Sequence, residues 1–518
     1  NDRYTVNGQY LQVMLSPREL SYADLPSKNW INERLIFTHG NGITLGPVSR
    51  ISREGLPEFF IKDIPPAGST DLKVQRPEIY YGEMSNDYVI VKTKIPEFSY
   101  PTPEGGNIYT SYGGAGGVKT GSLTRRLLFS LKYQTEKIFF SSDITADSKI
   151  LFFRNVKERF QKIAPFLLFD HDPYLVITDD GRLVWMVDAY TVSSRLPYSK
   201  PSVRRINYVR NAVKATLDAY DGTVTYYVSD PSDKIIQVYR RIFPALFKDL
   251  AVMPEDLKRH IRYPQWLLQL QASVYAAYHM TDPKIFYNKE NLWEIPVFEE
   301  KTMQPYYTIM KLPSEKREEY ILLLPYTPAK RDNLAAWLAA RCDAPHYGKL
   351  VVYTFPRDRL VFGPKQVDAR INQDSYISQQ LTLWSQRGSR VIRGSLLVIP
   401  VERSLLYVQP LYLAASDAVG LPELRRVIVA YENEVVMEEN LELALQRLFG
   451  SRKAGAVTTT TAGAPAAAAA PGRASVKELA AEAMKTYQRS VDMQRQGNWA
   501  GYGEEIRKLE QLLKKMAN

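Results

Sequence analysis

The stretch "PYLVITDDGRLVWMVDAYT" (residues 173–191) places two apolar runs on either side of Asp179, Asp180 and Gly181. Asp-Gly between apolar runs is a strong β-hairpin signal, because these residues accept the backbone angles of a tight turn. A second stretch, "TLDAYDGTVTYYVSDP" (residues 216–231), has the same arrangement around Asp221 and Gly222. The middle of the chain is therefore predicted to contain two β-hairpins.

Helical and strand-like patterns alternate irregularly on both sides of these hairpins. Apolar spacing and turn residues predict helices at 123–133, 150–166, 264–280, 333–342, 374–386 and 437–449. They predict strands at 88–98, 306–312, 320–326 and 349–355, and a hairpin at 394–413. This irregular order predicts an α+β fold with mainly antiparallel sheet rather than a parallel winding.

The length of 518 residues and a hydrophobic content of 45% allow several buried cores. We expect an α+β domain at 1–165, a hairpin and helical region at 166–300, and a second α+β domain at 301–450. Residues 451–474, rich in Ala, Thr and Pro, are typical of a disordered linker. Ser475 and Glu478 then form a capping-box pattern, which predicts a helical hairpin over 475–518.

Charge and cysteine content narrow the classes of function. Lysine and arginine number 67 against 56 aspartates and glutamates, and the excess is scattered, so nucleic acid is an unlikely partner. The single cysteine, Cys342, excludes an intrachain disulfide. We interpret it as a small residue that ends the helix expected at 333–342, with a nucleophile pair formed with His346 as the alternative. No apolar run approaches the roughly 18 residues that span a bilayer, and the first residues lack a signal-peptide pattern. We therefore expect the soluble piece of a larger protein.

A glycine-rich stretch, "YTSYGGAGGVKTGS" (residues 109–122), raises the question of phosphate binding. A P-loop requires Gly-Lys-Ser/Thr in succession, but Val118 separates Gly117 from Lys119, and the Rossmann spacing is absent as well. We predict no nucleotide motif here, and a flexible surface loop that leads into a helix. An anion contact at that helix start, with Lys119, is the alternative.

The candidate metal site lies in "FDHDP", which contains Asp170, His171 and Asp172. In an extended segment Asp170 and Asp172 point to the same side, an arrangement that suits a divalent cation or an acid/base pair. Asp before Pro is also ordinary turn chemistry, which is the simpler interpretation. A divalent cation is the one cofactor that the residues suggest. His39, in "THGNG", is expected to be a solvated turn residue, with a ligand or base role as the alternative.

A second group of candidates is basic. The segments "ARINQD" and "SQRGSRVIRG" bring Arg370, Arg387, Arg390 and Arg393 into a short span of sequence. Guanidinium groups bind phosphates and carboxylates at two points, and they equally form ion pairs between a helix and a strand. Both interpretations remain open at this point.

Several strings resemble uncharacterised protein family 0182. They are "FTHGNGITLGPVSRISREGLPEFFIKDIPP" (37–66), "RPEIYYGE" (76–83), "YHMTDPKIFYNKENLWEIP" (278–296), "ARINQDSYISQQLTLWSQRGSRVIRGSLLVIP" (369–400) and "LPELRRVIVAY" (421–431). In that family several N-terminal transmembrane helices precede a large soluble domain that is thought to face away from the cytoplasm. The resemblance implies no activity, cofactor or catalytic residue.

Together, the resemblance and the composition predict the extracytoplasmic portion of a polytopic bacterial membrane protein that acts in binding at the cell envelope. The expected partners are the membrane, through a transmembrane region outside this chain, and an anionic lipid, an envelope polymer or a protein. The alternative is a metal-dependent hydrolase or transferase that acts on an envelope substrate and uses Asp170, His171 and Asp172.

Overall fold

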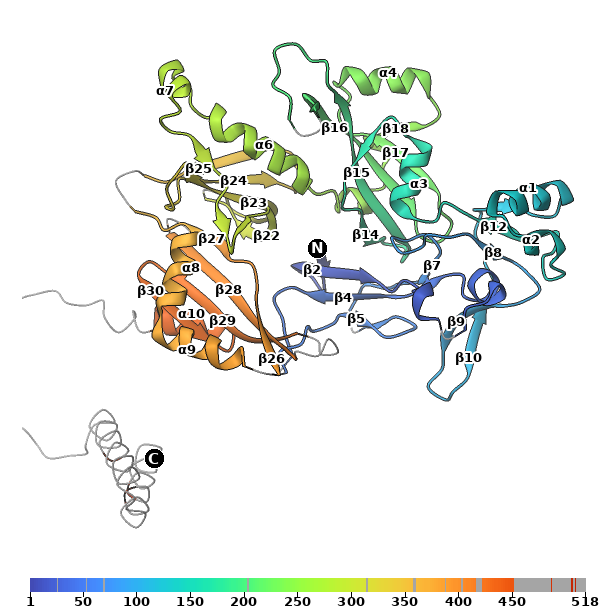
Figure 1. Cartoon of the computed structure of the whole chain (residues 1–518), viewed down its shortest axis with the longest axis horizontal. Coiled ribbons are helices and arrows are strands. Elements are labelled where there is room, and N and C mark those ends of the chain that lie inside the picture. The colour runs from blue at the N-terminus through green and yellow to red at the C-terminus, as the bar shows by residue number, and fades with distance from the viewer. Residues whose placement is uncertain are drawn as a thin grey trace, which may run out of the picture. The chain divides into compact units, whose positions relative to one another are not determined.

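The computed structural model describes residues 1–450, except 26, 53, 69, 203–204, 314, 357–359, 387, 402–403 and 416–421, together with Thr486, Glu505 and Lys508. The chain divides into two compact units, residues 1–453 and 454–518. The linker and helical hairpin predicted for 451–518 lie outside the described residues, apart from those three positions. The first unit has the predicted α+β fold with mainly antiparallel sheets (Figure 1).

The largest sheet contains both predicted hairpins, which are confirmed. Its antiparallel strands are β13 (Leu168–Phe169), β14 (Tyr174–Ile177), β15 (Leu183–Ser193), β16 (Tyr208–Asp218) and β17 (Val224–Val228), and β18 (Phe247–Asp249) joins in parallel. Side chains of β15 alternate between two cores: Trp185 and Val187 belong to one, Val184 and Met186 to the other. α3 (Val156–Ile163) covers the first face and α5 (Glu255–Lys258) covers the second.

The N-terminal region adds several small sheets. They are β1 (Asp2–Val6), β2 (Gln9–Pro17), β4 (Ile43–Pro47), β5 (Ile61–Lys62) and β6 (Ala67–Gly68); β3 (Gly40–Asn41) with β7 (Glu78–Ile79); β8 (Val89–Val91), β12 (Lys149–Leu151) and β11 (Val118–Lys119); and β9 (Glu97–Pro101) with β10 (Asn107–Thr110). The helices of this region are η1 (Tyr22–Asp24), η2 (Asn32–Ile36), α1 (Leu123–Tyr133) and α2 (Lys137–Phe140).

A further antiparallel sheet packs against α6 (Gln265–Tyr278), whose Leu268 and Ala272 share a core with Leu322. Its strands are β19 (Trp293–Glu294), β22 (Tyr306–Lys311), β23 (Glu318–Pro328), β24 (Ala336–Arg341) and β25 (Leu350–Thr354). α7 (Pro283–Asn288), β20 (Val297–Phe298) and β21 (Lys301–Thr302) are the other elements of this region. Two further elements, α4 (Lys234–Ile242) and η4 (Leu250–Val252), pack on the cores of the largest sheet through Ile236 and Leu250.

The last sheet of the unit is covered by helices on both faces. Its strands are β26 (Ser389–Arg393), β27 (Leu397–Val401), β28 (Ser404–Ala415), β29 (Glu423–Tyr431) and β30 (Glu434–Glu438). α8 (Pro364–Gln373) and α9 (Ser375–Trp384) share one core with β28, and α10 (Leu441–Gly450) shares the other. The helix predicted at 374–386 is confirmed, and the one predicted at 437–449 is confirmed from Leu441 onward, since Met437 and Glu438 belong to β30.

Three other predictions of secondary structure are wrong. Residues 336–341 form strand β24 instead of a helix, because Ala336 and Leu338 pack into one core while Trp337 and Ala339 pack into another. The alternation is hidden from the sequence, since both faces are apolar and alanine favours helices. Residues 149–151 form a strand, so the helix predicted from 150 begins only at 156, and the strand predicted over 88–98 is divided into β8 and β9.

The glycine-rich stretch leads into α1, as predicted, and it packs closely against its surroundings. A Cβ atom on Gly116 would lie 2.0 Å from the carbonyl oxygen of Asp221, and one on Gly114 would lie 2.4 Å from the ring of Tyr112. The amide of Gly113 donates to the hydroxyl of Tyr220 at 2.7 Å. The glycines therefore allow the backbone to approach a tyrosine cluster.

His39 belongs to the same neighbourhood and is buried, with 4% exposure, so the solvated turn position expected for it is wrong. Its Nδ1 lies 2.9 Å from Oγ1 of Thr38, which donates to the buried carboxylate of Glu97 at 2.6 Å. The ring packs on Tyr80 with 4.6 Å between centroids. Burial, followed by the charge of Arg154, lowers the pKa of His39 to about 3.

We expect Gly116→Ala to lower the free energy of unfolding by about 1–3 kcal/mol, because the added methyl group has no space beside Asp221. Gly450→Ala is the matched control, since a Cβ at that helix end meets no atom of the described residues within 4 Å. Urea unfolding of the two variants and the parent measures the difference, and equal midpoints for all three proteins would contradict the packing argument.

We also expect His39→Gln to weaken the pH dependence of stability. The folded pKa of about 3 lies below the ordinary value of 6.5, so the unfolded chain binds an extra proton as the pH falls and stability is lost through this window. Between pH 7 and pH 5 the parent should lose about 2 kcal/mol more than the variant. Urea unfolding at both pH values tests this, and parallel losses in the two proteins would show that His39 does not carry the effect.

Candidate functional site

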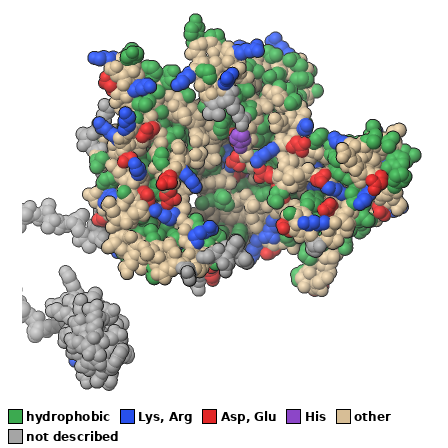
Figure 2. Space-filling view, viewed as in Figure 1, with side chains coloured by type: hydrophobic (Ala, Val, Ile, Leu, Met, Phe, Trp, Pro, Cys, Tyr) green, Lys and Arg blue, Asp and Glu red, His purple; other side chains and the backbone are tan. Residues whose placement is uncertain are grey.

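A cleft of about 1830 Å³ opens among segments that are far apart in sequence. Its main walls are strands β1 and β2, residues 250–261, residues 311–319, and the loop 342–347 that follows β24, and residues 71–75 and 177–179 complete the lining. The space-filling view shows the hollow between the large central sheet and the sheet built on β23 (Figure 2). A cleft of this size exceeds the roughly 300–1,000 Å³ of ordinary small-molecule pockets.

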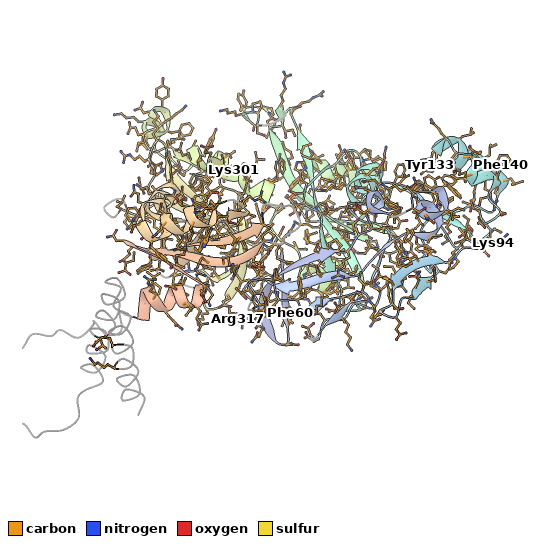
Figure 3. All side chains as sticks on the ribbon, turned by 60° about the horizontal axis from the view of Figure 1, so that its bottom comes forward. Phe60, Lys94, Tyr133, Phe140, Lys301 and Arg317 are labelled. Carbon is orange, nitrogen blue, oxygen red and sulfur yellow. The ribbon has the colours of Figure 1, made fainter. Side chains whose placement is uncertain are left out.

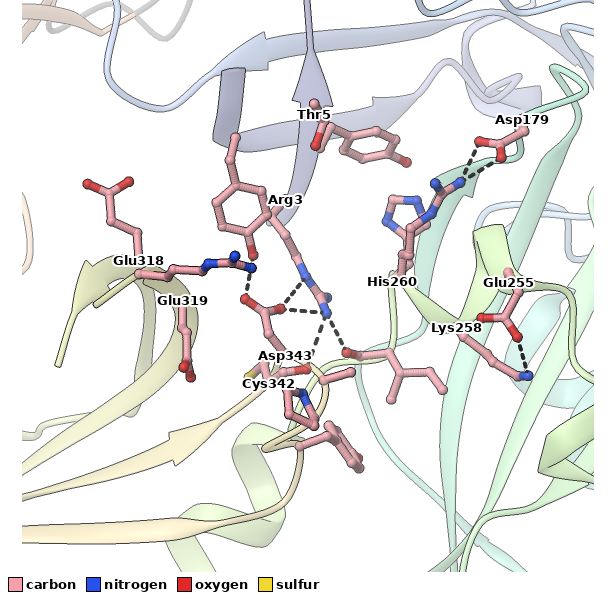
Figure 4. A pocket seen from close by; sticks show the side chains of 18 of the residues that line it. Arg3, Thr5, Asp179, Glu255, Lys258, His260, Glu318, Glu319, Cys342 and Asp343 are labelled. Carbon is pink, nitrogen blue, oxygen red and sulfur yellow. Dashed lines mark hydrogen bonds and ion pairs between the residues drawn. The ribbon is translucent and has the colours of Figure 1, made fainter. Parts of the chain in front are cut away.

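The floor of the cleft is a network centred on Arg3 of β1 (Figure 4). The Arg3 guanidinium donates to the carbonyl oxygen of Ile261 at 2.8 Å and to the carboxylate of Asp343 at 3.2 Å. Asp343 also accepts from the Tyr10 hydroxyl at 2.6 Å and from the backbone amide of Tyr320 at 2.7 Å. Burial opposes the charge of Arg3, but Asp2 and Asp343 outweigh burial and raise its pKa.

A buried histidine and carboxylate lie beside this floor. The Nδ1 atom of His260 is 2.8 Å from the Asp2 carboxylate, and Asp2 is only 2% exposed. Burial alone would raise the pKa of Asp2, but the interactions with His260 and Arg3 lower it overall. The carboxylate of Asp2 therefore stays charged next to two partners.

A second buried ion pair, between β15 and β16, contacts the loop 342–347 through Tyr347. The Lys214 ammonium of β16 contacts the Asp188 carboxylate of β15, and it donates to the Tyr347 hydroxyl at 2.5 Å. Lys214 and Asp188 are both buried, and Tyr347 lines the cleft. Removing either charge would leave the other buried without compensation, so this contact links the central sheet to the cleft wall.

Most acidic residues of the cleft are paired within the protein. Asp179 pairs with Arg259 at 2.6 Å, Glu255 pairs with Lys258 at 2.6 Å, and Asp343 pairs with Arg3 at 3.1 Å. Four basic residues that line the cleft form no ion pair with any described residue: Lys73, Lys311, Lys316 and Arg317. Two acidic residues of the lining, Asp71 and Glu318, also form no ion pair with any described residue. Glu318 lies opposite Lys311 in the register of β22 and β23. The unpaired charge along the walls is therefore mainly positive.

Glu315, Glu319 and His346 form a group within the cleft that could hold a metal ion, since their ligand atoms lie within 4.8 Å of one another. Two carboxylates and an imidazole are common ligands of divalent metals. Here Arg341 contacts both carboxylates, with 2.8 Å from its Nη1 to Glu315 and 2.7 Å from its Nε to Glu319. A metal at this position would have to compete with the guanidinium group.

Sequence reasoning missed this group. Glu315 precedes β23, Glu319 is the second residue of β23 and His346 follows β24, so only the pairing of these two strands brings the three residues together. The interpretation of residues 333–342 as a helix concealed that pairing. No local signal in the sequence indicates the group, because β24 is apolar on both faces and its strand character is hidden.

The predicted acidic candidates have separate partners. Asp170 accepts a hydrogen bond of 2.5 Å from the Tyr190 hydroxyl, and Asp172 pairs with Arg262 at 2.5 Å. Burial raises the pKa of Asp170. His171 is exposed, and none of the three candidates lines the cleft. Metal binding at Asp170, His171 and Asp172 stays a prediction.

The basic candidates fall into two groups. Arg370 donates to the carbonyl oxygens of Glu432 and Asn433 at 2.7 and 2.5 Å, and Arg393 pairs with Asp368 at 2.5 Å and with Glu299 at 3.1 Å. Lys119 and Arg390 are exposed on different sheets, and Arg387 lies outside the described residues. Arg370 thus lies on α8, and Arg393 of β26 contacts the same helix through Asp368, so both serve internal contacts. Lys119 lies on β11 of a different sheet. Anion binding by these five residues stays a prediction.

A model of the uncharacterised protein family UPF0182 matches residues 1–384. A UPF0182 protein of Geotalea uraniireducens is 69% identical over 517 residues, which cover 100% of this chain and 57% of that relative. A UPF0182 protein of Geobacter sulfurreducens has the same identity and coverage, and one of Pelotomaculum thermopropionicum is 51% identical over 523 residues with 57% of its length covered. No solved structure matches the chain.

The chain spans 57% of the length of these relatives and is a portion of a larger protein. By family match and by identity, it belongs to the uncharacterised protein family UPF0182.

Proposed function

We propose that this chain is the extracytoplasmic part of a polytopic bacterial membrane protein, and that its cleft binds an acidic polymer of the cell envelope. The observation that carries the binding proposal is the unpaired positive charge of Lys73, Lys311, Lys316 and Arg317 along the cleft walls. Their ammonium and guanidinium groups suit phosphates or carboxylates that recur along a flexible chain.

The size and construction of the cleft support a polymer over a small molecule. Its volume of about 1830 Å³ would leave a small ligand largely in water, whereas a segment of a polymer could lie along it. The floor formed by Arg3 and Asp343 is already fully hydrogen-bonded, so the ligand would meet a preformed surface. Preorganisation of this kind lowers the entropy cost of binding.

The membrane part of the proposal rests on the family. The resemblance noted in the sequence implies transmembrane helices before a soluble domain, and the curated relatives are longer than this chain. Among the helices in the described part of the chain, none has the length and hydropathy that crossing a bilayer requires. A metal-dependent hydrolase or transferase that uses Asp170, His171 and Asp172 stays the alternative prediction.

We expect Lys316→Gln/Arg317→Gln to weaken binding of low-mass dextran sulfate about tenfold, which corresponds to about 1.4 kcal/mol. The loss should be smaller at high salt, because screening already weakens these contacts. Isothermal titration with dextran sulfate, and with neutral dextran as the uncharged probe, measures the affinity at two salt concentrations.

Lys234→Gln/Lys248→Gln is the matched control for this experiment, because it removes two exposed charges from positions that do not line the cleft. Its affinity should remain within twofold of the parent. If both double variants lose the same affinity, the polymer recognises net charge alone and the cleft proposal fails.

We expect Tyr287→Cys, placed in the full-length membrane protein, to react with a membrane-impermeant maleimide in intact cells. Tyr287 of α7 is 86% exposed, whereas the native Cys342 is 2% exposed and burial raises the pKa of its thiol to about 12, so background labelling should be low. Mass shift of the purified protein measures labelling. Reaction only after the cells are permeabilised would place the domain in the cytoplasm and refute the extracytoplasmic assignment.

A further inference from the structure

The helices α1 and α2 carry apolar side chains on their outward side. Leu123, Leu127, Leu128 and Leu131 of α1 are 49–67% exposed, and Phe140 of α2 is 76% exposed. Leu123, Leu127 and Leu131 follow one another at four-residue spacing, and Leu128 precedes Leu131 by three residues, so the leucines form one continuous face along the helix. The space-filling view shows apolar side chains gathered over these helices at one end of the first unit (Figure 2).

The opposite side of α1 holds the helix on the protein. Phe129 and Tyr133 pack on the core cluster that contains Ile138 and Ile150. Arg126 donates to the carbonyl oxygens of Thr120 and Ile144 at 3.0 and 2.6 Å. In Figure 3, Phe140 lies at the outer end of this region and Tyr133 lies closer to the body of the unit. The exposed leucines are thus a second apolar face, additional to the one that the fold requires.

Basic residues accompany the apolar row. Arg125, Lys132 and Lys137 are exposed on the same two helices, and Lys119 is exposed just before them. Between residues 119 and 140, Glu136 is the sole acidic residue. The combination of aliphatic side chains with surrounding cations is complementary to a bilayer surface, whose acyl chains accept the leucines while acidic headgroups pair with the cations.

We propose that α1 and α2 dock on an anionic lipid bilayer surface, with Leu123, Leu127, Leu128, Leu131 and Phe140 inserted at the level between headgroups and acyl chains. Arg125, Lys132 and Lys137 contact the headgroup phosphates, because long basic side chains extend their charge away from buried apolar stems. The inference concerns a surface outside the cleft, and it does not depend on what the cleft binds.

The test is co-sedimentation of the full chain with vesicles of phosphatidylcholine that contain 30% phosphatidylglycerol, compared with phosphatidylcholine alone. We expect binding to the anionic vesicles only, and at least a tenfold lower partition coefficient for Leu128→Gln/Leu131→Gln. Arg125→Gln/Lys137→Gln should bind severalfold less and with a weaker salt dependence. Leu383→Gln/Val401→Gln, which changes two side chains of similar exposure on α9 and β27, should bind like the parent.

A fluorophore on Leu128→Cys gives a second measurement that does not require loss of apolar residues elsewhere. Its emission should shift to the blue when anionic vesicles are added. Equal partition of the parent and the leucine variant, or equal binding to both kinds of vesicle, would overturn the proposal. A fluorophore that is already shielded without vesicles would also overturn the proposal, because it would assign the apolar face to the C-terminal residues. A dimer of the parent that dissociates in the leucine variant would overturn it too, because it would assign the face to a second copy of the chain.

The cleft variant Lys316→Gln/Arg317→Gln separates this inference from the proposed function. It should keep the vesicle binding of the parent, since neither residue lies on α1 or α2. A loss of vesicle binding in this variant equal to that of the leucine variant would contradict docking through the helices.

Discussion

The guanidinium of Arg3 is the point at which three distant segments of the chain meet. It bonds the carbonyl oxygens of Ile261 and Cys342 and the carboxylate of Asp343, and it is itself 5% exposed. A buried cation is tolerated only when such partners replace its water. The position of β1 relative to residues 260–263 and to the loop after β24 follows from this requirement, and the cleft is the space that these segments enclose.

The fold could be predicted where the pattern of apolar and turn residues in the sequence matches the side chains that are buried in the structure. Asp180 and Gly181 between apolar arms identified the central hairpin, because turn chemistry is local. Strand β24 was not predictable in the same way. Leu338 and Trp337 face different cores, so no polar residue marks an exposed side, and the alanines favour a helix in isolation. Cross-strand burial between β23 and β25 overrides that preference.

The candidate site was less predictable, because its residues meet only through the fold. Arg3 and Asp343 are 340 positions apart, and no spacing rule connects them. The acidic pair chosen from the sequence, Asp170 and Asp172, has the local spacing that a shared ligand requires, but Tyr190 and Arg262 engage the two carboxylates separately. Proximity in sequence therefore identified a pair of acidic residues. It did not reveal the internal contacts that determine whether their carboxylates are free to bind a ligand.

The basic residues also differ in whether their charge is already paired within the protein, and this difference determines where an acidic ligand can bind. A net charge of +11 is spread over the chain and indicates no surface by itself. Arg370 and Arg393 satisfy carbonyl and carboxylate groups of their own protein, so binding an external anion would cost those internal contacts. Lys316 and Arg317 line the cleft without an ion pair to any described residue, so an acidic ligand gains their charge without breaking a contact. The cleft is therefore favoured as the binding site for an acidic ligand by its unpaired basic side chains, and not by the total charge of the chain.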